Sequence, residues 1–374
     1  LDQVEWTAAP VITRQPADAA VRSGATTTLT VGAESTSPLT YFWYEGEGDD
    51  REDLVPAGQG ADFTTPPVTA ASSYWVRVVD ALGQYTDSRA VRVMPAFEIR
   101  TAADLQKMGS GFDGWMPDAA YLVMNDIDAS ETAGWNEGAG FEPIGWDDPF
   151  TGILDGQGYT IGQLTINRPD DGAVGLFGVL ENGAFVKNVK LSDCTVIGGE
   201  EVGGLAGVMY ESSLQSCSVS GAVAGGEVVG GLIGSCGYGT VQSCYASGPV
   251  SGQWVVGGLI GWCGDSTVQS CYATGAVAGD LGVGGLIGGL EEYSSVDSCH
   301  ATGAVDGMYE AGGLIGSCGG GTVQSCYASG PVSGQWWAGG LIGGLYDGGF
   351  VYSCHAAGAV DGMYEAGGLI GSCG

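Results

Sequence analysis

From Gly203 onward the chain repeats one unit, Gly-Gly-Leu-(Ile/Ala)-Gly, which is followed by a cysteine-containing segment and a glycine-rich turn. The leucine of this unit recurs every 27 or 28 residues, at Leu205, Leu232, Leu259, Leu286, Leu314, Leu341 and Leu369. A fixed period of this length is the signature of a solenoid, in which each coil buries its apolar face by stacking on its neighbours. Short runs of Val, Ile, Leu and Tyr broken by turn residues predict strands instead of helices. We therefore expect an all-β protein whose repeats form a right-handed parallel β-helix, each coil having three short strands and three bends.

The sequence changes character twice, near residues 96 and 171, and this division predicts three segments. Residues 1–96 alternate polar and apolar positions in the manner of an antiparallel β-sandwich. Residues 97–170 are expected to form a capping helix and the first irregular coils, and residues 171–374 the regular repeats. The last unit stops just after Cys373, so we expect further repeats beyond Gly374 in the natural chain.

The charge of the chain restricts its partners. The formal net charge is −32, there are only 11 lysine and arginine residues, and none of them follows Lys190. Because a protein needs cationic groups to displace the counterions of a polyanion, nucleic acid is excluded as a partner of the repeats. The chain shows no charged-then-apolar leader and no apolar run of about 18 residues, so the part shown is not membrane-spanning. We expect a mature secreted product at the cell surface.

The first segment has the core positions of a sandwich domain. Trp43 stands where the core tryptophan of the third strand belongs, and Tyr74 stands two residues before Val76, as in a tyrosine corner. With these positions the segment resembles a bacterial immunoglobulin-like domain. Apolar residues, Leu29 and Val76, replace the inter-sheet cysteines, so packing alone must stabilise the domain. The resemblance implies a spacer or a binding module, and the fold does not choose between them.

The rest of the chain combines a capped helix with several glycine-rich motifs. A threonine-capped helix over Thr101–Met108 is expected to cover the first coil, whose backbone groups would otherwise lie unpaired. The motifs are Asn-Asp-Ile-Asp at 125–128, Phe-Thr-Gly-Ile-Leu-Asp-Gly-Gln-Gly at 150–158, Gly-Leu-Phe-Gly at 175–178 and the repeated Gly-Gly-Leu-Ile-Gly. Residues 97–374 are thereby similar to the GLUG-repeat proteins of bacterial and archaeal cell surfaces. The resemblance implies a parallel β-helix, in a group that includes adhesins, large exported proteins and modules beside protease domains.

Ten of the eleven cysteines recur with the repeat and form two columns. One column contains Cys217, Cys244, Cys271, Cys299, Cys326 and Cys354. The other, interrupted by leucines, contains Cys236, Cys263, Cys318 and Cys373. The thiols could stay reduced as small core residues, but an exported chain meets oxidising conditions in which well-placed thiols pair.

Two patterns of disulfide are open. Pairing between neighbouring coils is compatible with the ~4.8 Å spacing of parallel strands. Pairing within a coil, which we favour slightly, would give Cys236–Cys244, Cys263–Cys271 and Cys318–Cys326. A zinc site is not expected, because the chain has no Cys-x-x-Cys and only two histidines.

Two further columns carry rings. His300 and His355 take the place of tyrosines in other coils, and they are about 10 Å apart, so we interpret them as members of an aromatic column and not as a catalytic dyad. A second column, upstream of each Gly-Gly-Leu, contains Glu227, Trp254, Leu281, Tyr309, Trp336 and Tyr364. Rings exposed in a row can stack on sugars or on a partner protein, or they can pack over one another and shield the strands. The candidate contact residues are Trp254, Tyr309, Trp336, Trp337 and Tyr364.

The acidic residues offer weak candidates for metal binding or catalysis. One set has the spacing of a calcium loop: Asp126, Asp128, Ser130, Thr132 and Glu137. Because Glu131 stands where that loop needs glycine, calcium is only a minor alternative, and we expect no other cofactor. A second set recurs with the repeat and is expected at turns: Asp265, Asp280, Asp306, Glu310, Asp361 and Glu365. A catalytic site interrupts a repeat once instead of recurring with it, so we expect no enzyme.

The combined expectation is a non-enzymatic surface protein. We expect an adhesin or stalk, in which a rigid β-helical rod presents binding surfaces to a protein or glycan on a cell surface. The first alternative is a structural subunit that assembles with copies of itself into a filament, sheath or surface layer. The second alternative is a β-helix enzyme that cleaves a polysaccharide.

Overall fold

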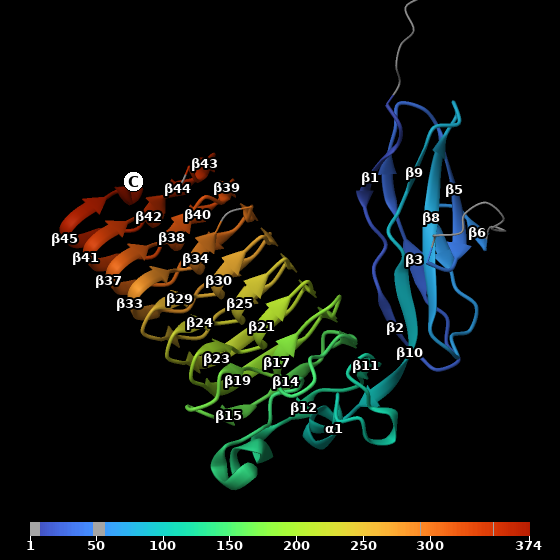
Figure 1. Cartoon of the computed structure of the whole chain (residues 1–374), viewed down its shortest axis with the longest axis horizontal. Helices are drawn as coiled ribbons and strands as arrows, with labels where there is room; N and C mark the ends of the chain where they lie inside the picture. Colours follow the sequence, from blue (N-terminus) through green and yellow to red (C-terminus); the bar gives the residue numbers. More distant parts are fainter. Residues whose placement is uncertain (1–7, 48–56, 292, 347) are drawn as a thin grey trace, which may run out of the picture. The chain divides into compact units, whose positions relative to one another are not determined.

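The computed structural model describes residues 8–47, 57–291, 293–346 and 348–374. These residues form mostly strands, and the chain divides into two compact units (Figure 1). The first unit contains the residues up to Glu98 and the segment Ala119–Leu122, and the second contains Ile99–Asp118 and Val123–Gly374. Most of the predicted capping segment therefore belongs to the same unit as the repeats.

The first unit is an immunoglobulin-like sandwich. Its strands are β1 (Val11–Arg14), β2 (Ala19–Arg22), β3 (Thr28–Thr30), β4 (Gly32–Glu34), β5 (Leu39–Glu45), β6 (Gly58–Gln59), β7 (Asp62–Thr64), β8 (Ser72–Asp80), β9 (Tyr85–Asp87) and β10 (Val91–Ile99). Trp43 is fully buried, its ring stacks on that of Phe63 with centroids 5.6 Å apart, and its Nε1 donates to the carbonyl of Gly60 at 2.9 Å. Leu29 and Val76 lie in the same buried cluster. The predicted core is therefore confirmed, and it contains no cysteine.

The second unit begins with the predicted helix, α1 (Ala102–Lys107). The Thr101 hydroxyl accepts the backbone N–H of Asp104 at 3.1 Å, and the Asp104 carboxylate accepts the N–H of Thr101 at the same distance. This reciprocal capping box satisfies N–H groups that have no partner within the helix. The helix is followed by η1 (Phe112–Gly114), β11 (Ala120–Val123), β12 (Ile127–Asp128), η2 (Ser130–Gly134) and η3 (Asn136–Gly138). No helix in the described part of the chain has the length and apolarity that a bilayer crossing requires.

The repeats form stacked coils, and each coil adds strands to three parallel sheets (Figure 1). Sheet I contains β17 (Phe177–Leu180), β21 (Ala206–Tyr210), β25 (Ile233–Gly237), β30 (Ile260–Gly264), β34 (Ile287–Glu291), β38 (Ile315–Gly319), β42 (Ile342–Tyr346) and β46 (Ile370–Cys373). The solenoid part of sheet II contains β13 (Ile153–Asp155), β18 (Phe185–Lys187), β22 (Ser213–Gln215), β26 (Thr240–Gln242), β31 (Thr267–Gln269), β35 (Ser295–Asp297), β39 (Thr322–Gln324) and β43 (Phe350–Tyr352). The predicted parallel β-solenoid is confirmed.

Sheet III is the widest, because most coils contribute more than one strand to it. It contains β12, β14 (Thr160–Gly162), β15 (Thr165–Asn167), β16 (Ala173–Val174), β19 (Lys190–Ile197), β20 (Glu201–Gly203), β23 (Ser218–Ala224), β24 (Val228–Gly230), β27 (Tyr245–Ala246), β28 (Val250–Ser251), β29 (Val255–Gly257), β32 (Tyr272–Ala273), β33 (Val277–Gly284), β36 (His300–Ala301), β37 (Val305–Gly312), β40 (Tyr327–Ala328), β41 (Val332–Gly339), β44 (His355–Ala356) and β45 (Val360–Gly367). Its outer surface is therefore the broadest face that the solenoid offers to a partner.

Equivalent residues of successive coils lie in register, so the core consists of columns of similar side chains. Ile260 of sheet I pairs with Ile233 on one side and with Ile287 on the other. All three side chains are fully buried, as are the leucines of the Gly-Gly-Leu unit from Leu205 to Leu341. Each coil thus covers the apolar face of the next, which is the energetic reason that one coil cannot fold alone.

The two glycines of each repeat unit allow close approach of backbone groups, the first within its own coil and the second to the next coil. A Cβ atom added to Gly284 would lie 1.8 Å from the carbonyl oxygen of Ile287. A Cβ atom added to Gly285 would lie 2.1 Å from the carbonyl oxygen of Gly313 in the next coil. Both distances are far below van der Waals contact, so these positions accept no side chain.

The bend between sheets II and III requires an uncommon backbone conformation. A serine with φ between 54° and 56° stands there in six coils: Ser216, Ser243, Ser270, Ser298, Ser325 and Ser353. A left-handed conformation costs a residue with a side chain roughly 1–2 kcal/mol. The bend places the following cysteine in the interior from Cys217 to Cys326, and that burial offsets the cost.

Candidate functional site

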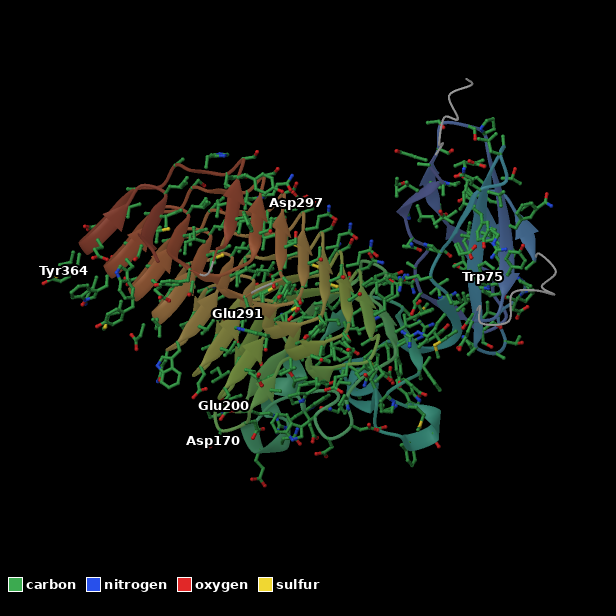
Figure 2. The ribbon with its side chains drawn as sticks, turned by 45° about the horizontal axis from the view of Figure 1, so that its top comes forward. Trp75, Asp170, Glu200, Glu291, Asp297 and Tyr364 are labelled. Carbon is green, nitrogen blue, oxygen red and sulfur yellow. The ribbon has the colours of Figure 1, made fainter. Side chains whose placement is uncertain are left out.

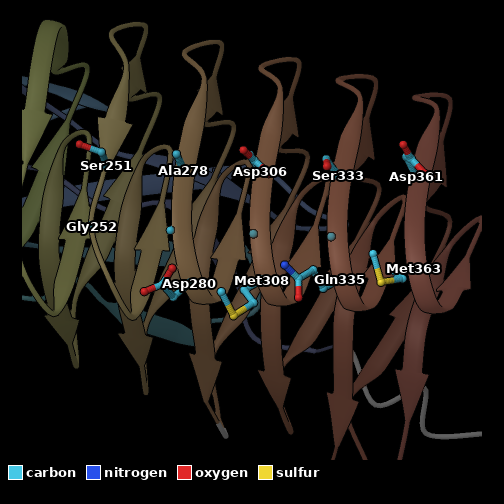
Figure 3. A pocket seen from close by; sticks show the side chains of 13 residues that line it. Ser251, Gly252, Ala278, Asp280, Asp306, Met308, Ser333, Gln335, Asp361 and Met363 are labelled. Atoms are coloured by element: carbon cyan, nitrogen blue, oxygen red, sulfur yellow. The ribbon is translucent and has the colours of Figure 1, made fainter.

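The outer surface of sheet III carries a groove of about 800 Å³ that crosses several coils (Figure 3). One side of the groove is a row formed by Ser251, Ala278, Asp306, Ser333 and Asp361. The opposite row is formed by Asp280, Met308, Gln335 and Met363. Gly252, Gly279, Gly307 and Gly334 lie between the rows. The groove therefore runs along the stacking direction and is lined by one or more residues from each of five coils.

Alternation along the strands explains the shape of this groove. A Cβ atom on Gly252 would lie 2.7 Å from Cγ2 of Val229, and one on Gly279 would lie 2.8 Å from Cγ2 of Val256. The glycines thus face the core, and the residues on either side of each glycine face solvent. The groove is the space between two rows of outward side chains. On each strand, the residue of one row is two positions from the residue of the other row.

Three of the acidic residues that we expected at turns lie in strands. Asp280 belongs to β33, Asp306 to β37 and Asp361 to β45, and all three line the groove. Glu310 and Glu365 also lie within strands, where φ values of 51° and 49° mark a local bend. The expectation holds for Asp265, which lies at the bend between β30 and β31, and it was wrong for the other five acids because their strands continue through the neighbouring glycines. These acids consequently contribute to a surface of the sheet and not to separate loops.

The groove lining combines carboxylate, hydroxyl, amide and thioether groups. No lysine or arginine exists between residues 191 and 374 to neutralise the carboxylates. An anionic ligand would therefore be repelled, whereas hydroxyl or ammonium groups could donate hydrogen bonds to the lining. Among the described residues, no group of three or more His, Cys, Asp or Glu side chains is placed to hold a metal ion.

The candidate contact aromatics are not part of the groove lining, and four of them belong to one column. Trp254, Tyr309 and Tyr364 are 51%, 38% and 48% exposed, and Figure 2 shows Tyr364 projecting outward from its coil. The ring centroids of Tyr309 and Trp336 are 6.5 Å apart with planes 10° from parallel, and those of Trp336 and Tyr364 are 4.1 Å apart with an angle of 18°. Because sugars stack on ring faces, the faces that these rings turn to one another are not available to a sugar. The geometry of these three residues favours shielding of the strands.

The other two contact candidates have different surroundings. Trp337 has a φ of 56°, and its Nε1 donates to the carboxylate of Glu365 in the next coil. Trp254 is followed one coil later by an aliphatic residue, Leu281, at the equivalent position. Trp254 is therefore the candidate whose ring face is least covered by another ring of the column. The contact role of all five aromatics stays a prediction.

The histidine column is a continuous stack of rings. His300 lies between Tyr272 and Tyr327, with centroid distances of 5.0 and 4.7 Å, and Tyr327 in turn contacts His355 at 5.3 Å. All three pairs are within 12° of parallel. A tyrosine thus separates the two histidines, in agreement with the interpretation that they are members of an aromatic column. Burial lowers the pKa of His300.

Replacing His300 with tyrosine is expected to reduce the loss of stability in mild acid. The lowered pKa means that the unfolded chain binds a proton at His300 more readily than the folded chain does. This contribution to stability is fully present above the ordinary histidine pKa of about 6.5, and it is lost as the pH falls through the lower pKa of the folded state. Urea unfolding of both proteins between pH 7.5 and 5 measures the difference. An equal pH dependence in the two proteins would contradict the expectation.

All eleven cysteines are free thiols in this structure, and most are buried. Contacts run along the columns: the N–H of Cys217 lies 3.4 Å from Sγ of Cys244, and the N–H of Cys244 lies 3.4 Å from Sγ of Cys271. The register also pairs Cys236 with Cys263 in the next coil. Burial raises the pKa of Cys194 to about 12, which suppresses the reactive thiolate.

The disulfide pairs that we favoured, Cys236–Cys244, Cys263–Cys271 and Cys318–Cys326, are not formed here. Cys236 lies in β25 of sheet I, whereas Cys244 follows the bend after β26 of sheet II. Each cysteine instead lies beside the equivalent residue of the neighbouring coil, because the register aligns each column with itself. Sequence spacing could not reveal this, since it shows which cysteines are close along the chain and not which sheets they occupy.

The candidate calcium ligands have structural partners within the chain. The Asp126 carboxylate accepts the N–H of Thr160 at 2.8 Å, and the Asp128 carboxylate accepts the N–H of Ser130 at 3.0 Å. The buried Thr132 hydroxyl donates to the carbonyl of Ala129 at 2.7 Å. These oxygens support strand β12 and the turn after it, and calcium binding by this set stays a prediction.

Two family models match the chain. The model of the Ig-like domain described as CHU_C associated matches residues 8–95, and the model of the GLUG motif matches residues 279–306. Halomucin of Haloquadratum walsbyi is 40% identical over 133 residues, which cover 34% of this chain and 1% of halomucin. A Gly-rich membrane protein of Evansella cellulosilytica is 36% identical over 121 residues, which cover 30% of this chain and 13% of that protein. The chain thus spans only a small part of either relative.

The solved structure of an IgA1 protease aligns with 94% of this chain and 29% of its own. The TM-score is 0.47 and the identity 15%, values too low to support an argument about function. The two family matches instead agree with the two compact units and with the in-register glycine-rich coils. The chain therefore joins an immunoglobulin-like domain to a β-solenoid of the GLUG-repeat type.

Proposed function

We propose that this chain is part of an extracellular cell-surface protein and that its solenoid serves as a binding rod, as in an adhesin or stalk. Halomucin and the Gly-rich membrane protein, to which about a third of this chain is similar, support a place at the cell boundary. The strongly acidic composition supports an exposed location, because net charge keeps a protein soluble and separate from its copies. The groove on sheet III is the observation that carries the binding role.

The ligand that fits this groove best is an extended, uncharged glycan lying along the stacking direction. Ser333 and Gln335 offer hydrogen bonds to sugar hydroxyls, Asp306 adds a strong acceptor, and Met308 offers an apolar surface to sugar C–H groups. Coils repeat at ~4.8 Å, so a polymer in the groove meets comparable side chains at each step. The lining contains no lysine, arginine or histidine, and we propose binding without cleavage.

Ser333→Tyr is expected to weaken glycan binding about tenfold or more, because the new ring would fill the groove between Asp306 and Asp361. Ser317→Tyr is the matched control on the outer surface of sheet I, where the same column already holds Trp262. Binding of the full chain to an array of neutral polysaccharides measures both variants. Equal binding by the two variants would contradict the groove as the site.

Two other outcomes would also contradict the proposed function. Binding of a lysine-rich peptide in place of any neutral glycan would assign the groove to a cationic protein segment. Assembly of the purified chain into ordered filaments, seen by sedimentation and electron microscopy, would favour a structural subunit. Because the repeats are acidic and lack lysine and arginine, such assembly would have to depend on added salt or divalent cations.

A further inference from the structure

The strongest unassigned feature lies inside the solenoid, where two cysteines meet across a coil interface. Cys236 of β25 and Cys263 of β30 are direct partners in the parallel register of sheet I. Parallel neighbours are separated by ~4.8 Å between Cα atoms, which lies within the range that a disulfide spans. Both side chains are fully buried, and the Cys236 thiol donates to the Ser266 hydroxyl in the next coil at 3.5 Å. The two cysteines thus lie side by side on neighbouring strands in a buried interior.

No other two cysteines of this column are adjacent. Met209 precedes Cys236 in the register, and Leu290 follows Cys263. The remaining cysteines of the column are Cys318, flanked by Leu290 and Leu345, and Cys373, which pairs with Leu345. The column therefore permits one direct link, Cys236–Cys263.

In the longer column, the same contact joins each cysteine to the cysteine of the next coil. The N–H of each cysteine lies 3.3 to 3.4 Å from Sγ of the cysteine in the next coil, for Cys217, Cys244, Cys271, Cys299 and Cys326. If links form only between neighbouring coils, all six cysteines can be paired in one way. The first is then linked to the second, the third to the fourth, and the fifth to the sixth. Those links are Cys217–Cys244, Cys271–Cys299 and Cys326–Cys354.

We propose that these cysteines form disulfides between adjacent coils, with Cys236–Cys263 as the defining pair and three further links in the longer column. Each link forms when two thiols lose two protons and two electrons and an S–S bond joins their sulfur atoms. The oxidant is a disulfide compound of the exported compartment, which accepts both electrons and becomes a pair of thiols. Oxidation accompanies the docking of each new coil, before the sulfur atoms are buried. The links then reinforce coils that otherwise depend on apolar packing and on the backbone hydrogen bonds of the parallel sheets.

Disulfide mapping of the full chain tests this proposal. The reduced, unfolded chain is refolded with oxidised glutathione, residual thiols are alkylated, and the product is digested with pepsin in acid, where thiolate is scarce and exchange is slow. Trypsin is unsuitable because no lysine or arginine follows Lys190. We expect mass spectrometry to find a peptide pair that joins Cys236 to Cys263. Links from Cys236 to Cys244 or from Cys263 to Cys271, or free thiols throughout a folded product, would overturn the proposal.

Two variants give a second readout. Cys263→Ser removes one half of the defining pair, and Cys318→Ser is the matched control, because Cys318 is equally buried but has leucine on both sides in its column. After oxidative refolding, we expect Cys263→Ser to melt roughly 5–15 °C below Cys318→Ser. Under reducing conditions this difference should vanish. Equal melting of the two oxidised variants would count against the link, and mapping of the unmutated chain decides the matter if either variant fails to fold.

Discussion

Gly285→Ala is expected to disrupt the stacking of the coils and to lower the stability of the solenoid by about 3 kcal/mol or more. The added Cβ would lie 2.1 Å from the carbonyl oxygen of Gly313, and a backbone atom cannot move aside as a flexible side chain can. The same Cβ would also lie 3.0 Å from Cβ of Ala301. Urea unfolding followed by far-ultraviolet circular dichroism measures the loss as a lower midpoint.

The chain provides a control for this variant at the same position of the repeat. Gly368 is also the second glycine of a Gly-Gly-Leu unit, but a Cβ atom there has no neighbour within 4 Å. Gly368→Ala should therefore change the stability of this chain by less than about 0.5 kcal/mol. If both variants lost the same stability, the backbone conformation of glycine and not the approach of the next coil would explain the motif.

Trp43→Ala is expected to destabilise the immunoglobulin-like domain by about 3–5 kcal/mol, a large part of the stability of a domain of this size. The substitution removes a fully buried ring that stacks on Phe63 and a hydrogen bond to the carbonyl of Gly60. Trp75, buried in the same domain, remains as the fluorescent reporter of its unfolding. Urea titration monitored by tryptophan fluorescence gives the change in midpoint.

Trp43→Phe separates the two contributions of this side chain. The phenyl ring keeps an aromatic group against Phe63 but cannot donate to Gly60. We expect a smaller loss, about 1–2 kcal/mol, from the missing hydrogen bond and the reduced volume. A loss as large as that of Trp43→Ala would show that the hydrogen bond, and not the packing of the ring, stabilises this core.

Much of the fold could be predicted because the repeat imposes the same requirement many times. A leucine every 27 or 28 residues predicts stacked coils, and the structure buries those leucines from Leu205 to Leu341. Thr101 predicts a helix start through local chemistry alone, and its capping bond is present, together with the reciprocal bond of Asp104. Trp43, Leu29 and Val76 predict the sandwich core because a strand's alternation decides which side chains face inward.

The candidate site could be predicted only in part. The aromatic and histidine columns follow from the period, since equivalent residues of successive coils must lie side by side. The orientation of these rings does not follow from the period. Trp336 and Tyr364 pack face to face, so these two ring faces are not available to a ligand. The groove was missed because Asp306 and Asp361 were expected at turns, whereas the strand continues through the glycines beside them. Alternating outward residues around a glycine at the same place in five coils were the signal that could have revealed it.

Local and periodic features of this protein are thus encoded in its sequence. They are the coil length, the helix cap, the sandwich core and the absence of side chains at the two glycine positions of each Gly-Gly-Leu unit. These depend on residue size, hydrophobicity and spacing, which act within one coil or identically in all coils. Contacts across sheets and coils were decided by the tertiary structure. It placed Cys236 against Cys263 instead of Cys244, and it held the serines before the cysteine column in a left-handed bend. Such contacts depend on the path of the backbone between strands, and that path is set by the packing of all coils together.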